Sequence, residues 1–183
     1  MVIYMKKETL WITRTALMVA LLIAVQFATR SLGQLVTGSC VNLILAVAVL
    51  ACGYKSGITV ALLSPFFAFL LGIGPALIAI VPAISVGNAV FVTVLYFASK
   101  KLGPKAGPLV GIWAFLSVVA AAAAKFLALF LLVTRLILPM LGLPEAKAAA
   151  MTAMFSWPQL VTAFIGGVAA VLIVPLLHLK KTD

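Results

Sequence analysis

The sequence predicts an all-α integral membrane protein with six membrane-spanning helices in one transmembrane domain, residues 1–183. Hydrophobic residues make up 66% of the chain and charged residues 9%, whereas soluble domains are about half apolar and about a quarter charged. The mean hydropathy is +1.32. Because a helix crosses the hydrocarbon core with about 20 apolar residues, a chain of this length accommodates six crossings joined by short loops. We therefore expect no separate soluble domain.

The first four expected helices are apolar stretches separated by breakers or charges. They cover about 11–31, 39–53, 56–71 and 75–99, and the GIGP sequence ends the third. The fourth contains Pro82, which removes a backbone donor and is expected to bend the helix.

The second half of the chain contains two further apolar stretches. The basic, glycine- and proline-rich segment 100–108 predicts a loop, and the fifth helix covers about 109–134. Residues 138–151 are expected to form a loop with a short surface helix. The sixth helix covers about 155–177, with Pro158 near its start.

The basic residues indicate the orientation of the helices, because cytoplasmic loops of membrane proteins are enriched in lysine and arginine. With a cytoplasmic N-terminus, three basic residues fall outside: Arg30, Arg135 and Lys147. Nine fall inside: Lys6, Lys7, Arg14, Lys55, Lys100, Lys101, Lys105, Lys180 and Lys181. We therefore expect both termini in the cytoplasm.

The first expected helix has a small residue at every fourth position: Ala16, Ala20, Ala24 and Ala28. Residues with this spacing share one face of a helix. Small residues let membrane helices approach closely, which apolar side chains alone do not favour in lipid. The alanine edge is therefore predicted to dock either on other helices of this chain or on a partner.

A basic N-terminus, this alanine pattern and six spans in under 200 residues resemble the substrate-binding S components of energy-coupling factor (ECF) transporters. The matching stretch is ALMVALLIA, residues 16–24, continued by Ala28. The resemblance implies that the first helix docks on a transmembrane coupling protein driven by two cytoplasmic ATPases. The chain itself then needs no cofactor, since its partners use the ATP. It would be a multi-pass protein of a prokaryotic plasma membrane.

The resemblance also implies a substrate cavity open to the outside, formed by the outer halves of the last three helices and capped by loops. Lys125 is the main candidate in this zone. Lying about ten residues inside the fifth helix, it is about 15 Å deep, where a lysine is unfavourable by about 2.5 kcal/mol or more. It either lines a polar cavity and contacts ligand, where it suits a carboxylate or phosphate, or snorkels to an interface.

Three uncharged polar residues fall in or near the same zone. Asn88 lies in the middle of the fourth expected helix, and a buried amide there either binds ligand or links two helices. Asn42 lies near the outer end of the second helix, and Gln34 lies in the first outer loop. Each of these two either caps a cavity or satisfies loop backbone.

Four residues lie at the expected outer membrane edge. Arg30 and Arg135 either anchor the helices at the interface or, with Lys125, make a strongly positive pocket. Trp157 and Gln159 flank Pro158 at the start of the sixth helix. A tryptophan at this level is either an interface-belt residue or stacks on a planar ligand.

These observations predict a binding subunit that captures a small, anionic organic micronutrient. An ion-coupled secondary transporter commonly uses intramembrane carboxylates, whereas the three acidic residues are Glu8, Glu145 and Asp183, terminal or in a loop. A membrane enzyme would need a nucleophile–base pair or a metal cluster, which the sequence does not suggest, and no metal site is predicted. The alternatives are an ion-coupled secondary transporter and a small membrane channel or scaffold.

Overall fold

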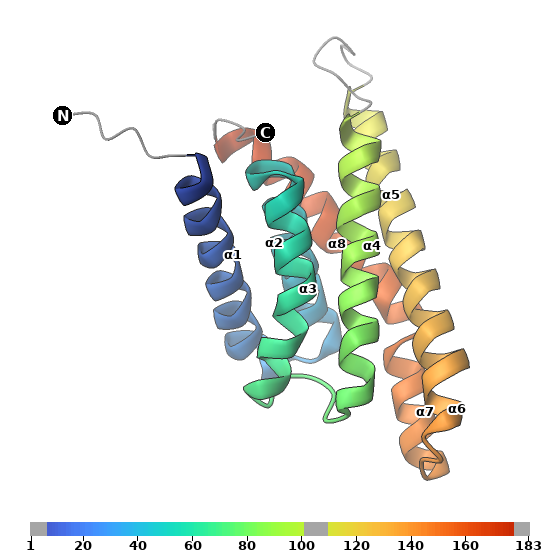
Figure 1. Ribbon diagram of the computed structural model, residues 1–183. Coiled ribbons are helices and arrows are strands. Elements are labelled where there is room, and N and C mark those ends of the chain that lie inside the picture. The colour runs from blue at the N-terminus through green and yellow to red at the C-terminus, as the bar shows by residue number, and fades with distance from the viewer. Residues whose placement is uncertain (1–6, 101–109, 178–183) are drawn as a thin grey trace, which may run out of the picture.

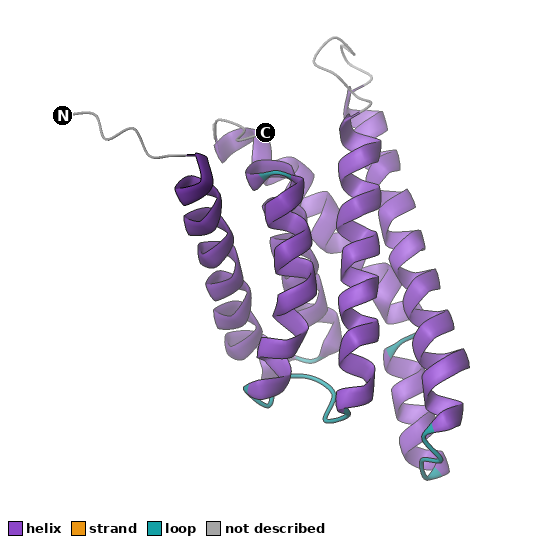
Figure 2. Cartoon of the chain, in the orientation of Figure 1, coloured by secondary structure: helices purple, strands orange, loops and turns teal. Residues whose placement is uncertain are grey.

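The computed structural model describes residues 7–100 and 110–177, and every regular element in these ranges is a helix (Figures 1 and 2). The first half comprises α1 (Lys7–Thr29), η1 (Arg30–Leu32), α2 (Gln34–Cys52), α3 (Tyr54–Leu70), η2 (Ile78–Ile80) and α4 (Val81–Lys100). The second half comprises α5 (Val110–Leu129), the π-helical η4 (Phe130–Ile137), α6 (Leu138–Met140), α7 (Glu145–Met154), α8 (Trp157–Ile173) and η5 (Val174–Leu177). The predicted all-α class is confirmed.

The long helices form an apolar bundle. Within the described ranges, five helical stretches are long and apolar enough to cross a membrane, and α3 is a shorter apolar helix of 17 residues. The start of α1 and the end of η5 lie at one end of the bundle, whereas α6 and α7 lie at the other (Figure 1). We call the end that holds η1, α6 and α7 the cavity end, after the cavity described below.

Glycine in the left-handed backbone region makes the first two connections very short. Gly33 has φ of +86° and Gly53 has φ of +92°, values that only glycine adopts readily. Each lets the chain reverse between helices within one or a few residues. As a result α2 begins at Gln34, five residues before the predicted 39, and Gln34 is helical where a loop was expected.

The fourth and fifth helices also differ from the sequence prediction. Residues 75–77 are not helical, and α4 begins at Val81 after one 3-10 turn. Pro82 therefore stands in the first turn of α4, where its missing N–H is not needed, and does not mark a bend within the helix. The fifth helix continues past 134 as π-helical η4 and α6, which end at Met140.

Other expectations agree more closely with the structure. The short surface helix expected in 138–151 is α7, which has no buried side chain. The sixth helix is α8 followed by η5, with Pro158 in its first turn. Apart from Lys100, the predicted loop at 100–108 lies outside the described residues.

The main core joins α2 to α8 and the neighbouring helices. Its fully buried side chains include Leu22, Leu45, Phe91 and Val118. Glycines bring the backbones together: a Cβ added to Gly166 would lie 2.5 Å from Leu43 N on α2. Close approach through small residues is the usual way in which apolar helices associate in lipid.

Candidate binding cavity

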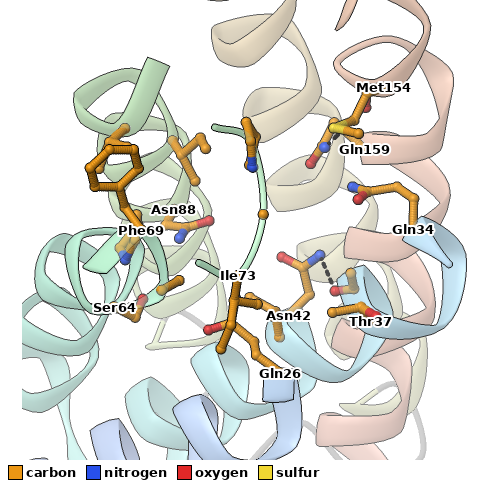
Figure 3. A pocket seen from close by; sticks show the side chains of 18 of the residues that line it. Gln26, Gln34, Thr37, Asn42, Ser64, Phe69, Ile73, Asn88, Met154 and Gln159 are labelled. Carbon is orange, nitrogen blue, oxygen red and sulfur yellow. Dashed lines mark hydrogen bonds between the residues drawn. The ribbon is translucent and has the colours of Figure 1, made fainter. Parts of the chain in front are cut away.

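A cavity of about 350 Å³ lies at the cavity end of the bundle. Its walls come from α1, α2, α3, α4, α5 and α8, together with the turn between α3 and η2 and the α7–α8 junction. Figure 3 shows Ser64 and Asn88 on one side of this space and Gln34 and Gln159 on the other. The volume falls in the range of sites for small molecules.

Lys125 of α5 contributes the buried positive charge of the cavity wall. Its side chain is 3% exposed, so it does not snorkel to an interface. Its Nζ donates to Asn42 Oδ1 at 2.6 Å and to Asn88 Oδ1 at 2.7 Å, and lies 5.6 Å from the centre of the Phe91 ring. Two amide oxygens and an aromatic face are partners that stabilise a buried ammonium group.

Asn42 is held in the orientation that Lys125 requires. Its Nδ2 donates to Gly38 O at 2.8 Å and to Thr162 Oγ1 at 3.3 Å. Because the amide nitrogen is engaged on that side, the amide oxygen faces Lys125. Thr162 Oγ1 in turn donates to Gln159 O at 3.3 Å, so this network ties α2 to α8.

Gln159 links the cavity to the α7–α8 junction. Its side chain is buried, and its Nε2 donates to Met154 O at 3.1 Å. Both residues line the cavity. The hydrogen bond therefore positions the end of α7 at the cavity wall.

Two buried polar atoms in the wall have no hydrogen-bond partner. They are Gln26 Oε1 of α1 and Ser64 Oγ of α3, and both residues line the cavity (Figure 3). Buried polar groups in folded proteins are nearly always hydrogen-bonded. These two atoms are thus available to a molecule inside the cavity.

The electrostatic character of the cavity is positive. Lys125 and Arg30 line it, and none of the acidic residues that the structure describes does. Among the described residues, the acidic side chains are Glu8 and Glu145, at the starts of α1 and α7. Arg30 is exposed, with its guanidinium 4.3 Å from the centre of the Phe27 ring. A positive, partly desolvated site favours an anion, since attraction between charges strengthens as water is excluded.

Of the eight predicted binding residues, six meet at this cavity: Lys125, Asn88, Asn42, Gln34, Arg30 and Gln159. Asn88 and Asn42 line it and also link helices through Lys125. Ligand binding by Asn88 stays a prediction. Gln34 is a wall residue at the start of α2.

Arg135 and Trp157 are not among the residues that line the cavity, so a positive pocket that includes Arg135 and ligand stacking on Trp157 have no support here. Arg135 is exposed, and its guanidinium lies 5.3 Å from the centre of the Phe130 ring of its own helix. Trp157 is 61% exposed. Residues two positions apart in the sequence point in directions about 200° apart around a helix. Because Gln159 faces the cavity, Trp157 faces away from it.

Sequence reasoning missed several wall residues. Gln26 is an amide within an apolar stretch, a signal that could have marked it. Ser64 precedes a proline and has no such signal. Pro65 and Phe69 line the cavity, although packing and bending are the roles that their sequence context favours.

The alanine edge of α1 is not packed against this chain. Ala16, Ala20, Ala24 and Ala28 are all exposed, and α1 lies at the margin of the bundle (Figure 1). The close helix contacts inside the bundle are made by glycines, such as Gly38 against Thr162. The internal packing suggested as one explanation of the alanine edge is thus absent from the described residues.

Residues 7–100 and 110–177 contain no group of three histidine, cysteine, aspartate or glutamate side chains that could hold a metal ion. The polar groups at the cavity suit hydrogen bonding to an organic molecule instead. Comparison of the chain with protein-family models, curated proteins and solved structures gives no match.

Proposed function

We propose that this chain is the substrate-binding S component of an ECF-type importer and captures a small organic micronutrient with an anionic group. The observation that carries the proposal is the cavity built around Lys125 at one end of an apolar helix bundle. Burying a lysine inside a membrane helix is energetically unfavourable, and residues of this kind usually mark functional sites. Since no acidic residue of 7–100 or 110–177 lines the cavity, the charge of Lys125 is available to a ligand.

The exposed alanine edge supports the second half of the proposal. Ala16, Ala20, Ala24 and Ala28 leave a smooth strip on α1 that no described helix of this chain covers. Such a strip suits close docking of another membrane helix. We assign it to the transmembrane coupling protein, which two cytoplasmic ATPases would drive with ATP in a prokaryotic plasma membrane.

Native mass spectrometry of the protein, gently purified from the membranes of its own host, tests the proposal directly. We expect a bound molecule of a few hundred daltons, retained by wild-type protein and lost from Lys125→Met. The matched control is Lys55→Met, because Lys55 is an exposed lysine in the first turn of α3 and does not line the cavity. The proposal would be contradicted if wild-type protein carried no bound small molecule and no coupling protein purified with it.

A further inference from the structure

The hydrogen-bonding capacity left over at the cavity indicates the chemistry of its ligand. A lysine ammonium has three donors. Lys125 uses two of them on Asn42 and Asn88. The described residues make no third hydrogen bond with it, and the Phe91 ring at 5.6 Å offers an aromatic face but no oxygen acceptor. The group that completes this site therefore presents an oxygen acceptor, and the positive charge favours an anionic one.

The opposite requirement arises at Gln26. A carboxamide oxygen only accepts hydrogen bonds, and Gln26 Oε1 is buried without a donor. Ser64 Oγ, on a side chain that is 1% exposed, is also without a partner, and a hydroxyl can either donate or accept. The wall therefore lacks one donor at Gln26 and one partner of either kind at Ser64.

We infer that the ligand is a small organic carboxylate that also carries a hydroxyl or N–H donor. Its carboxylate receives the third Lys125 donor, and its own donor bonds to Gln26 Oε1 or bridges Gln26 and Ser64. Pro65, Phe69 and Ile73 of the same wall provide apolar contact for the carbon skeleton between the two groups. This inference rests on the proposed function and narrows the class of substrate.

Matched probes separate the two requirements. The full-length protein in detergent is titrated calorimetrically with ω-hydroxy carboxylates of about three to eight carbons, a size range that the cavity accommodates. Each acid is compared with its ω-hydroxy amide, which lacks the charge, and with the unsubstituted alkanoate, which lacks the donor. The series scans the distance between the two groups.

We expect one chain length to bind best, with the matched amide and the matched alkanoate each about tenfold weaker. The amide oxygen still accepts from Lys125, but a neutral acceptor binds an ammonium group more weakly than a carboxylate does. The alkanoate leaves Gln26 Oε1 without a donor. In Lys125→Met the preference for acid over amide disappears. In Gln26→Leu the preference for hydroxy acid over alkanoate disappears while the acid–amide preference remains. Lys55→Met behaves as wild type.

Equal binding of acids and amides by wild-type protein overturns the inference, and so does the absence of binding by every probe. In either case the proposed function stands if the protein purified from its host still holds a small molecule. The proposed function falls as well only if that molecule is absent and no coupling protein purifies with the chain.

Discussion

Lys125 Nζ of α5 lies 2.6 Å from Asn42 Oδ1 of α2, a contact that joins residues 83 positions apart in the chain. The same amine bonds to Asn88 Oδ1 of α4 at 2.7 Å. Three helices therefore meet on one buried side chain at the cavity wall. The shape of the cavity wall and the stability of the bundle therefore depend on the same contacts.

The first prediction concerns this junction. Asn42→Leu removes one acceptor from a buried ammonium group and should lower the free energy of unfolding by about 1–3 kcal/mol. Adding Lys125→Met removes the amine that lacks its partner, so the double variant should be more stable than the sum of the single effects predicts, by about 0.5–3 kcal/mol. Unfolding titrations in mixed detergent micelles measure these differences.

The control is a second cycle in which Lys55→Met takes the place of Lys125→Met. Lys55 is an exposed lysine at the start of α3. Asn42→Leu and Lys55→Met should be additive within about 0.5 kcal/mol, because distant sites without shared partners do not couple. Additivity of the Asn42–Lys125 pair would show that the hydrogen bond contributes nothing specific.

The second prediction concerns the contact of α2 with α8. A Cβ on Gly166 would lie 2.5 Å from both Leu43 N and Ser39 O, backbone atoms that cannot turn aside. Gly166→Ala should therefore separate the helices and destabilise the protein by about 1–3 kcal/mol. Gly111→Ala, with no atom within 4 Å of the added Cβ, should be neutral or slightly stabilising. Thermal unfolding followed by circular dichroism compares the two variants.

The third prediction tests the alanine edge of α1. If the proposed function holds, replacing Ala20 and Ala24 with tryptophan should prevent co-purification of the proposed coupling protein and stop uptake, because the bulky side chains hold a partner helix away. Binding by the isolated subunit should survive, since neither residue lines the cavity. The same change at Ala120 and Ala123, exposed alanines of α5, should leave assembly intact. Loss of ligand binding in the α1 variant would argue against an edge reserved for a partner.

The fourth prediction separates wall residues from their neighbours on the surface. Gln159→Leu should weaken retention of the host-derived small molecule, because Gln159 lines the cavity and holds the end of α7 through Met154. Trp157→Ala and Arg135→Gln should leave retention unchanged, since neither residue is part of the wall. Native mass spectrometry of each variant gives the occupied fraction. Reduced occupancy in Trp157→Ala would mean that this tryptophan folds over the ligand.

Boundaries of helices were the part of the fold that sequence patterns predicted least well. Hydropathy indicates that a segment is apolar but not where its first turn begins. Gly33 shows the difficulty: its positive φ allows α2 to start directly after η1, and nothing in the hydropathy of 34–38 reveals this. Hydropathy also did not indicate the π-helical conformation of η4, because its residues are as apolar as those of an α-helix.

The all-α class, the approximate positions of the apolar helices and the place of Lys125 within one of them could be predicted from the amino-acid sequence. These features follow from the free energy of transferring side chains from water to an apolar medium. That free energy depends on each residue by itself or on a short stretch of sequence. Only the tertiary structure decided that Gln26 and Ser64 join Lys125, and that Arg135 and Trp157 do not. That outcome depends on how each helix is rotated about its axis and how closely glycines such as Gly166 let neighbours approach, which are properties of pairs of helices distant in the chain.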